Sequence, residues 1–185
     1  MNYSHGVLND YTSVSPSDVA AVTETAIAAA DELVNRAAAA EHPTWANTLA
    51  LLESAAAIVT DAYGKGPFLA RVHPDKTVQS RAIELEETLQ KWSTELAFRR
   101  DLYEAVRHYA DSAEAASLSP ARRRLVDHWM RDFRRAGHEL SEEARTELQA
   151  KQMRLIELQV EFSKNLDEFE HVIEVAAQEL DGMSP

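Results

Sequence analysis

The sequence predicts an all-α protein in which about five helices form a bundle or a stacked array, with one long helix toward the C-terminus. Apolar residues recur at spacings of three, four and seven through most of the chain, which is typical of amphipathic helices. The five glycines and six prolines fall between these periodic segments or beside them and interrupt none of them. Only the stretch "HVIEVAAQ" (171–178) leaves a choice between helix and edge strand.

The first predicted helix ends near Ala39. Ser15 is placed to cap its N-terminus, and Asp18 can complete a capping box with that serine. Pro16 suits the first helical position because its missing N–H would have no partner there. Residues 1–14 carry no such pattern, so a flexible N-terminal tail is expected before the helix.

The next two predicted segments are separated by the loop "GPFLARVHPD" (66–75). The second helix begins at "HPTW" (42–45) and is expected to end at Gly64. The third runs on to Tyr109, with the polar "RRD" (99–101) expected to kink or break it. The apolar faces of these two segments consist of Trp45, Leu49, Leu52, Ala56, Val59 and Tyr63, and of Leu85, Leu89, Trp92 and Leu96.

The last two predicted helices begin at serines. Ser119 precedes a fourth helix in which Leu125, Trp129 and Phe133 lie four residues apart. Ser141 precedes a fifth helix that continues to about Val175 and would span roughly 50 Å. It has two apolar stripes, a seam with a period of seven formed by Leu148, Leu155, Phe162 and Phe169, and a second stripe formed by Met153, Ile156 and Val160. Two stripes predict neighbours on both sides of this helix.

The dipeptide "HE" at 138–139 begins like a zinc-protease motif, His-Glu-x-x-His, in which two histidines four residues apart bind the metal. Here the fourth residue after the histidine is Glu142. Gly137 is expected to end one helix and Ser141 to cap the next, so the histidine lies in a joint. The sequence therefore favours a structural turn, with Leu140 packed against the domain.

Other histidine and carboxylate pairs also fail as sites. Glu168 and His171 form half of a ferritin-like di-iron signature, but no other histidine has a glutamate three residues before it. Two further pairs are of a kind that arises by chance in an acidic helical protein: Glu104 with His108, and Asp127 with His128. No Gly-rich phosphate loop or nucleophile elbow occurs. We therefore predict no catalytic, cofactor-binding or metal-binding residue in this chain.

Composition excludes several classes of function. The 31 acidic and 19 basic residues give a net charge of -12, which disfavours binding to nucleic acid or to an anionic membrane. Cysteine is absent, which fits a reducing compartment, and the opening "MNYSHGVLND" has no features of a secretory signal. No apolar run approaches the roughly 20 residues needed to cross a bilayer. A soluble, cytoplasmic protein is expected.

The one concentrated basic stretch is "ARRRLVDHWMRDFRR" (121–135). Its three consecutive arginines, Arg122 to Arg124, would fan around a helix rather than form one stripe. A solvated face paired with acidic neighbours is the favoured interpretation. The alternative is an arginine patch that contacts another domain.

Three segments occur in a specific order and spacing: "SPSDVAAVTETAIAAADEL" (15–33), "PTWANTLALLE" (43–53) and "RDFRRAGHELSEEARTELQAKQMRLIELQVEFSKNL" (131–166). Together they resemble the N-terminal helical region of the thimet oligopeptidase, oligopeptidase A and peptidyl-dipeptidase family of zinc metallopeptidases. The resemblance covers residues 15–185, which we expect to form one helical domain, and residues 1–14 match little of it. The C-terminal "QELDGMSP" resembles the stretch that leads into the family's next domain, so a piece of a longer protein is expected.

The resemblance implies a non-catalytic domain that forms one wall of a channel admitting only short peptides. In the family, zinc is held by a His-Glu-x-x-His helix and a third glutamate in a later catalytic domain, and this chain contains no copy of that motif. The chain alone should therefore be inactive, should carry no cofactor and should have its own catalytic domain as partner. The sequence does not distinguish an endo-acting oligopeptidase from a dipeptidyl carboxypeptidase.

Two further expectations follow from the long fifth helix. A seam built to meet a catalytic domain would be left exposed in this chain, so a dimer of the fragment is possible. The alternative to the metallopeptidase hypothesis is a free-standing helical module that binds a partner helix in a groove.

Overall fold

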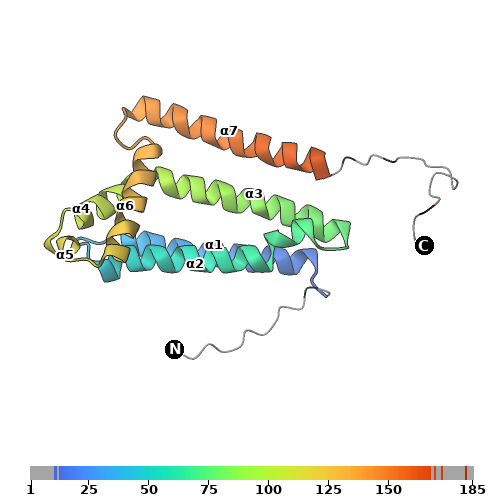
Figure 1. Ribbon diagram of the computed structural model, residues 1–185, viewed down its shortest axis with the longest axis horizontal. Helices are drawn as coiled ribbons and strands as arrows, with labels where there is room; N and C mark the ends of the chain where they lie inside the picture. The colour runs from blue at the N-terminus through green and yellow to red at the C-terminus, as the bar shows by residue number, and fades with distance from the viewer. Residues whose placement is uncertain (1–10, 12, 168, 170–171, 173–181, 183–185) are drawn as a thin grey trace.

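The computed structural model describes residues 11, 13–167, 169, 172 and 182, and all regular structure in these residues is helical (Figure 1). The all-α prediction is confirmed. Helices α1 (Pro16–Ala38), α2 (Ala50–Lys65), α3 (Lys76–Phe98) and α7 (Glu142–Asp167) lie roughly along the long axis of the molecule. Helices α4 (Arg100–Ala110), α5 (Ala113–Ala116) and α6 (Pro120–Arg135) gather at one end.

The start of α1 is as predicted. The backbone N–H of Ser15 donates to the Asp18 carboxylate at 2.9 Å, and the N–H of Asp18 donates back to the Ser15 hydroxyl at 3.3 Å. Pro16 occupies the first helical position. The serine hydrogen bonds hold the pKa of Asp18 below its usual value, because they stabilise the ionised carboxylate.

The second predicted helix consists of two parts. A π-helical turn, η1 (Trp45–Leu49), precedes α2, and Thr44 caps it through a reciprocal pair of hydrogen bonds with Asn47 at 2.7 and 3.2 Å. The predicted end at Gly64 is wrong, because α2 continues to Lys65 and is followed by Gly66. A Cβ at Gly66 would lie only 3.2 Å from the Thr23 hydroxyl of α1, so this glycine permits close approach.

The chain between α2 and α4 differs from the prediction in one place. The expected loop contains a short 3₁₀ helix, η2 (Pro67–Arg71). The polar "RRD" does break the third segment, because Arg99 takes an extended conformation between α3 and α4. Its guanidinium holds this break by binding Asp101 at 2.5 Å and the Asn35 side chain of α1 at 2.6 Å.

The last helix is shorter than predicted. Its 26 residues span about 39 Å at 1.5 Å per residue, and Phe169 and Val172 lie outside it. The predicted continuation to Val175 is therefore wrong. Of the ambiguous stretch 171–178, only Val172 belongs to the described residues.

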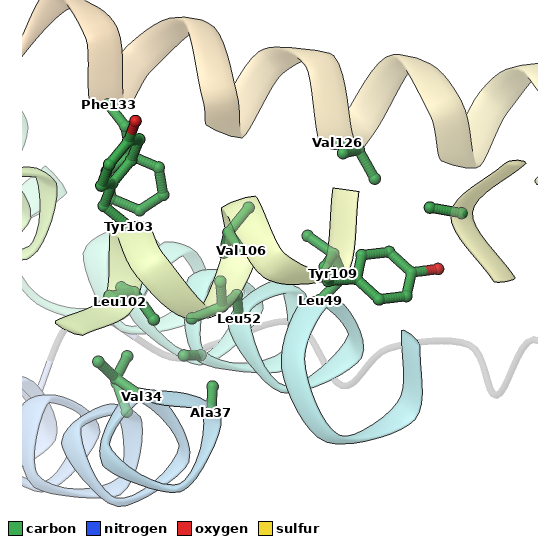
Figure 2. Close-up of a cluster of buried hydrophobic side chains, with 13 residues drawn as sticks. Val34, Ala37, Leu49, Leu52, Leu102, Tyr103, Val106, Tyr109, Val126 and Phe133 are labelled. Carbon is green, nitrogen blue, oxygen red and sulfur yellow. The ribbon is translucent and has the colours of Figure 1, made fainter. Parts of the chain in front are cut away.

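Most of the core lies around α4 (Figure 2). Leu102, Val106 and Tyr109 of α4 are fully buried between α6 on one side and α1 and α2 on the other. Phe133 and Val126 of α6 close this cluster. A second cluster lies around α1, η2 and α3 and contains Val19, Leu69, Ala70, Val78, Ala82 and Leu85. The described part of the chain contains no helix long and apolar enough to cross a membrane.

Candidate functional site

The joint between α6 and α7 is a structural turn, as predicted. The N–H of Gly137 donates to the carbonyl of Arg134 at 2.9 Å, and the N–H of His138 donates to that of Phe133 at 3.3 Å. Gly137 takes a φ of +85°, so the two bonds form a glycine C-cap of the Schellman type. Ser141 accepts a hydrogen bond from the N–H of Ala144 at 3.3 Å and so caps α7.

His138 is buried in this joint, where its ring contacts a backbone carbonyl and two aromatic rings. Its Nε2 hydrogen-bonds the carbonyl of Ala97 at 2.8 Å, and its ring stacks on Tyr103 with centroids 4.7 Å apart. Arg100 donates to the backbone carbonyl of the same histidine at 2.7 Å. Burial lowers the pKa of His138, because the charged imidazolium would lose its hydration. The expectation for Leu140 is wrong: it is 54% exposed, and the histidine fills the interior instead.

Of the three remaining histidine pairs, the structure describes two, Glu104 with His108 and Asp127 with His128. Glu104 pairs with Arg100 and Arg107, each at 2.5 Å, and not with His108. Glu168 and His171 lie outside the described residues. Among the residues that the structure describes, no group of three or more His, Asp or Glu side chains could hold a metal ion.

The arginines of α6 act largely within the domain. Arg122 lies over the ring of Trp45 with its guanidinium carbon 4.5 Å from the ring centroid. Arg123 donates to the carbonyl of Ala115 in α5. Arg131 and Arg135 pair with Asp132 at 3.0 and 3.9 Å. Contacts in several directions agree with the predicted fan rather than with a single basic stripe.

Helix α7 presents an apolar face that no described residue covers, which we call the α7 face. It consists of Leu155 (53% exposed), Leu158 (44%), Phe162 (65%) and Leu166 (61%). The other stripe packs inward: Ile156 is buried, and α7 lies along α3 (Figure 1). Of the predicted seam, Leu155 and Phe162 are exposed as expected, whereas Leu148 is half-buried and Phe169 lies outside the helix. The predicted neighbour on that side is absent from the described residues.

A second surface feature is a groove between α2 and α3, which we call the α2–α3 groove. It consists of two cavities of about 430 and 510 Å³ that share Val59, Thr60 and Ser93. The first cavity reaches α6, and the second reaches Ile156 of α7. The sequence does not predict this groove, because its walls come from four helices whose packing no local pattern encodes.

The lining of the groove suits binding rather than catalysis. Its apolar part includes Leu52, Val59, Leu89, Trp92, Leu96, Leu125, Trp129 and Ile156. The indole N–H of Trp92 donates to Asp31 at 2.7 Å, and that of Trp129 donates to Glu53 at 3.3 Å. The one hydroxyl–carboxylate pair among the described lining residues is Tyr63, whose hydroxyl donates to Glu86 at 3.3 Å, and Arg71 also binds that carboxylate. Sites of this size and composition are typical of ligand-binding pockets.

The fold and these surfaces define a helical domain with an exposed apolar face on α7 and an apolar groove. The family described as Neurolysin/Thimet oligopeptidase, N-terminal domain, matches residues 22–145, which is more than half of the chain. This chain therefore belongs to that family, as its sequence resemblance indicated.

A curated relative supports the assignment. The Thimet-like oligopeptidase of Dictyostelium discoideum is 27% identical to this chain over 149 residues. The matched region is 77% of this chain but 22% of that relative. The chain thus spans about a fifth of the length of the curated relative that it matches.

Proposed function

We propose that this chain is the non-catalytic, channel-wall domain of a zinc-dependent oligopeptidase or peptidyl-dipeptidase that hydrolyses short peptides. Membership in the oligopeptidase N-terminal family supports this proposal. So does the site itself, in which the described residues offer surfaces for binding but no catalytic constellation. The chain's role is then to position a neighbouring domain and to limit which molecules reach it.

The observation that carries this proposal is the α7 face. From Leu155 to Leu166 it extends about 16 Å along the helix, and each of its four side chains is at least 44% exposed. Soluble monomers rarely leave such a contiguous apolar strip uncovered unless it meets a partner. A relative of which this chain matches 22% has ample further sequence to supply that partner. We therefore propose that the catalytic domain of a longer protein packs on the α7 face.

The zinc of the proposed enzyme would be held outside the described residues of this chain. These residues do not fit a zinc site, because no group of three or more of their His, Asp and Glu side chains could hold a metal ion. The buried His138 uses its Nε2 for a hydrogen bond with the Ala97 carbonyl, and its ring stacks on Tyr103. No step of peptide hydrolysis is assigned to residues of this chain.

Peptidase activity on a fluorogenic oligopeptide in the presence of zinc tests the proposal. The comparison is between this chain alone and the protein read from the complete downstream gene. We expect hydrolysis only by the longer protein. Hydrolysis by neither protein would overturn the proposal and favour a free-standing helical module that binds a partner helix.

A second experiment tests docking on the α7 face. In the longer protein, the double variant Leu155→Lys, Phe162→Lys should lower the melting temperature and the activity, because two lysines would be forced into an apolar interface. The matched control, Ala150→Lys, lies on an exposed part of the same helix away from this strip and should leave both unchanged. Equal behaviour of the two variants would show that the catalytic domain does not cover the α7 face.

A further inference from the structure

The α2–α3 groove has the size and shape of a ligand-binding site, which membership in the family does not by itself indicate. Its two cavities join along Val59, Thr60 and Ser93, so an extended ligand could occupy both. Each cavity lies within the range of roughly 300–1,000 Å³ that is usual for ligand pockets. The groove is separate from the α7 face, which lies on the outer side of α7.

Two tryptophans form the distinctive part of the groove. Trp92 and Trp129 come from α3 and α6, and both are half-buried. Each indole N–H already has a carboxylate acceptor, Asp31 for Trp92 and Glu53 for Trp129. The rings are thereby fixed, and their remaining surface is available to an apolar or cationic group.

The charge of the lining is one-sided. Among the residues that line the two cavities are the carboxylates Glu53, Asp132 and Glu86, and none is Lys or Arg. Two of these carboxylates already have arginine partners: Asp132 pairs with Arg131 at 3.0 Å, and Glu86 pairs with Arg71 at 2.9 Å.

Glu53 differs from the other two carboxylates. Its contact in the described structure is the indole N–H of Trp129, which leaves its negative charge without a cation among the described residues. A positively charged ligand group placed at Glu53 would therefore meet both the carboxylate and the adjacent indole ring of Trp129.

We propose that the α2–α3 groove binds a short cationic peptide. A lysine or arginine side chain of the peptide lies against Glu53 and Trp129. A neighbouring aromatic or large aliphatic side chain packs on Trp92, Leu96 and the apolar wall beyond them. This inference rests on the proposed function only for its ligand class, short peptides, because binding can be measured without hydrolysis.

The test uses two peptides that differ in one side chain. The first is acetyl-Ala-Phe-Lys-Phe-Ala-amide, and the second has norleucine in place of lysine. In calorimetric titrations of this chain at low ionic strength, the lysine peptide should bind about threefold to tenfold more tightly. That preference should shrink at high ionic strength, because salt screens the interaction with Glu53. Absence of saturable binding, or equal affinity for the two peptides, would overturn the proposal.

A charge-neutral variant locates the preference. Glu53→Gln keeps an oxygen that can accept from the Trp129 indole but removes the negative charge. We expect it to lose the preference for lysine while its affinity for the norleucine peptide stays the same. The matched control, Glu32→Gln, removes one charge from an exposed position on α1 outside the groove and should retain the preference. Retention by Glu53→Gln would place the cation elsewhere and refute the assignment.

The same titration on the longer protein separates this inference from the proposed function. The longer protein is used after chelation of its metal, so that the peptides are bound but not cleaved. We expect the lysine preference to persist. Its loss, with hydrolytic activity of the untreated protein intact, would show that other parts of the protein cover the groove, which refutes a peptide site there but leaves the proposed function standing.

Discussion

Replacing glycine by alanine at two positions provides a sharp test of the structure. The change should lower the stability at Gly137, in the joint between α6 and α7, and raise it at Gly64, in α2. Gly137 has a φ of +85°, and a Cβ there would lie 3.0 Å from side-chain carbons of Leu140 and Leu148. Gly64 lies inside α2, and a Cβ there would meet nothing within 4 Å. Alanine is therefore strained at the first position and free at the second.

The magnitudes follow from the backbone. A left-handed conformation costs a non-glycine residue about 1–2 kcal/mol. The two leucine ends can shift, since Leu140 is largely exposed, so they add little. Alanine also restricts the unfolded chain, which returns roughly 0.4–1 kcal/mol. The net expectation is that Gly137→Ala lowers the free energy of unfolding by about 1 kcal/mol, whereas Gly64→Ala raises it by about 0.5–1 kcal/mol.

Urea denaturation followed by far-UV circular dichroism measures both variants. At an unchanged m-value, a shift of the midpoint reports the change in stability. Gly137→Asn is a useful third variant, because asparagine adopts the left-handed conformation more readily than alanine and should lose less. The reasoning fails if Gly137→Ala is as stable as the wild type, or if the two alanine variants shift in the same direction.

Two further predictions concern the pKa of His138 and the α7 face. Burial depresses the pKa of His138 in the folded state, so unfolding is favoured as the pH falls below about 6.5, the ordinary histidine value, where the unfolded chain binds the proton first. Stability should therefore decline on acidification, and His138→Gln should remove that part of the decline, whereas an identical pH profile would show that the histidine does not cause it. For the α7 face, sedimentation should show this chain self-associating with rising concentration, since no described residue covers its exposed apolar strip. Phe162→Lys should abolish the association while Ala150→Lys should not, and association that survives Phe162→Lys would place the contact elsewhere.

Local signals in the sequence predicted most of the helix boundaries. The capping box at Ser15 and the break at Arg99 follow from interactions between residues close in the chain, and the structure confirms both. The end of α2 also follows a local signal, because Gly66 precedes Pro67 and a proline disfavours the helical conformation of the residue before it. What the structure adds is that the backbone at Gly66, unlike that at Gly64, lies close to Thr23 of α1.

The sequence pattern predicts too late an end for α7. Apolar residues continue past Asp167 with the same spacing, so the pattern predicts further helix. A helix with one exposed apolar side gains little from packing in its last turns, and periodicity alone does not fix its length. The short helix α5 likewise escapes prediction, because four residues are too few to show a period.

The sequence by itself determined the fold class, the joint at Gly137 and the family, because each depends on residue types at short, fixed spacings. It also showed that α7 has two apolar stripes. Only the tertiary structure decided which stripe is buried, since Ile156 packs inward and Phe162 does not. It alone brought Glu53, Trp92 and Trp129 to one groove. These three residues lie on three different helices, and their proximity depends on how the helices cross, which no local pattern encodes.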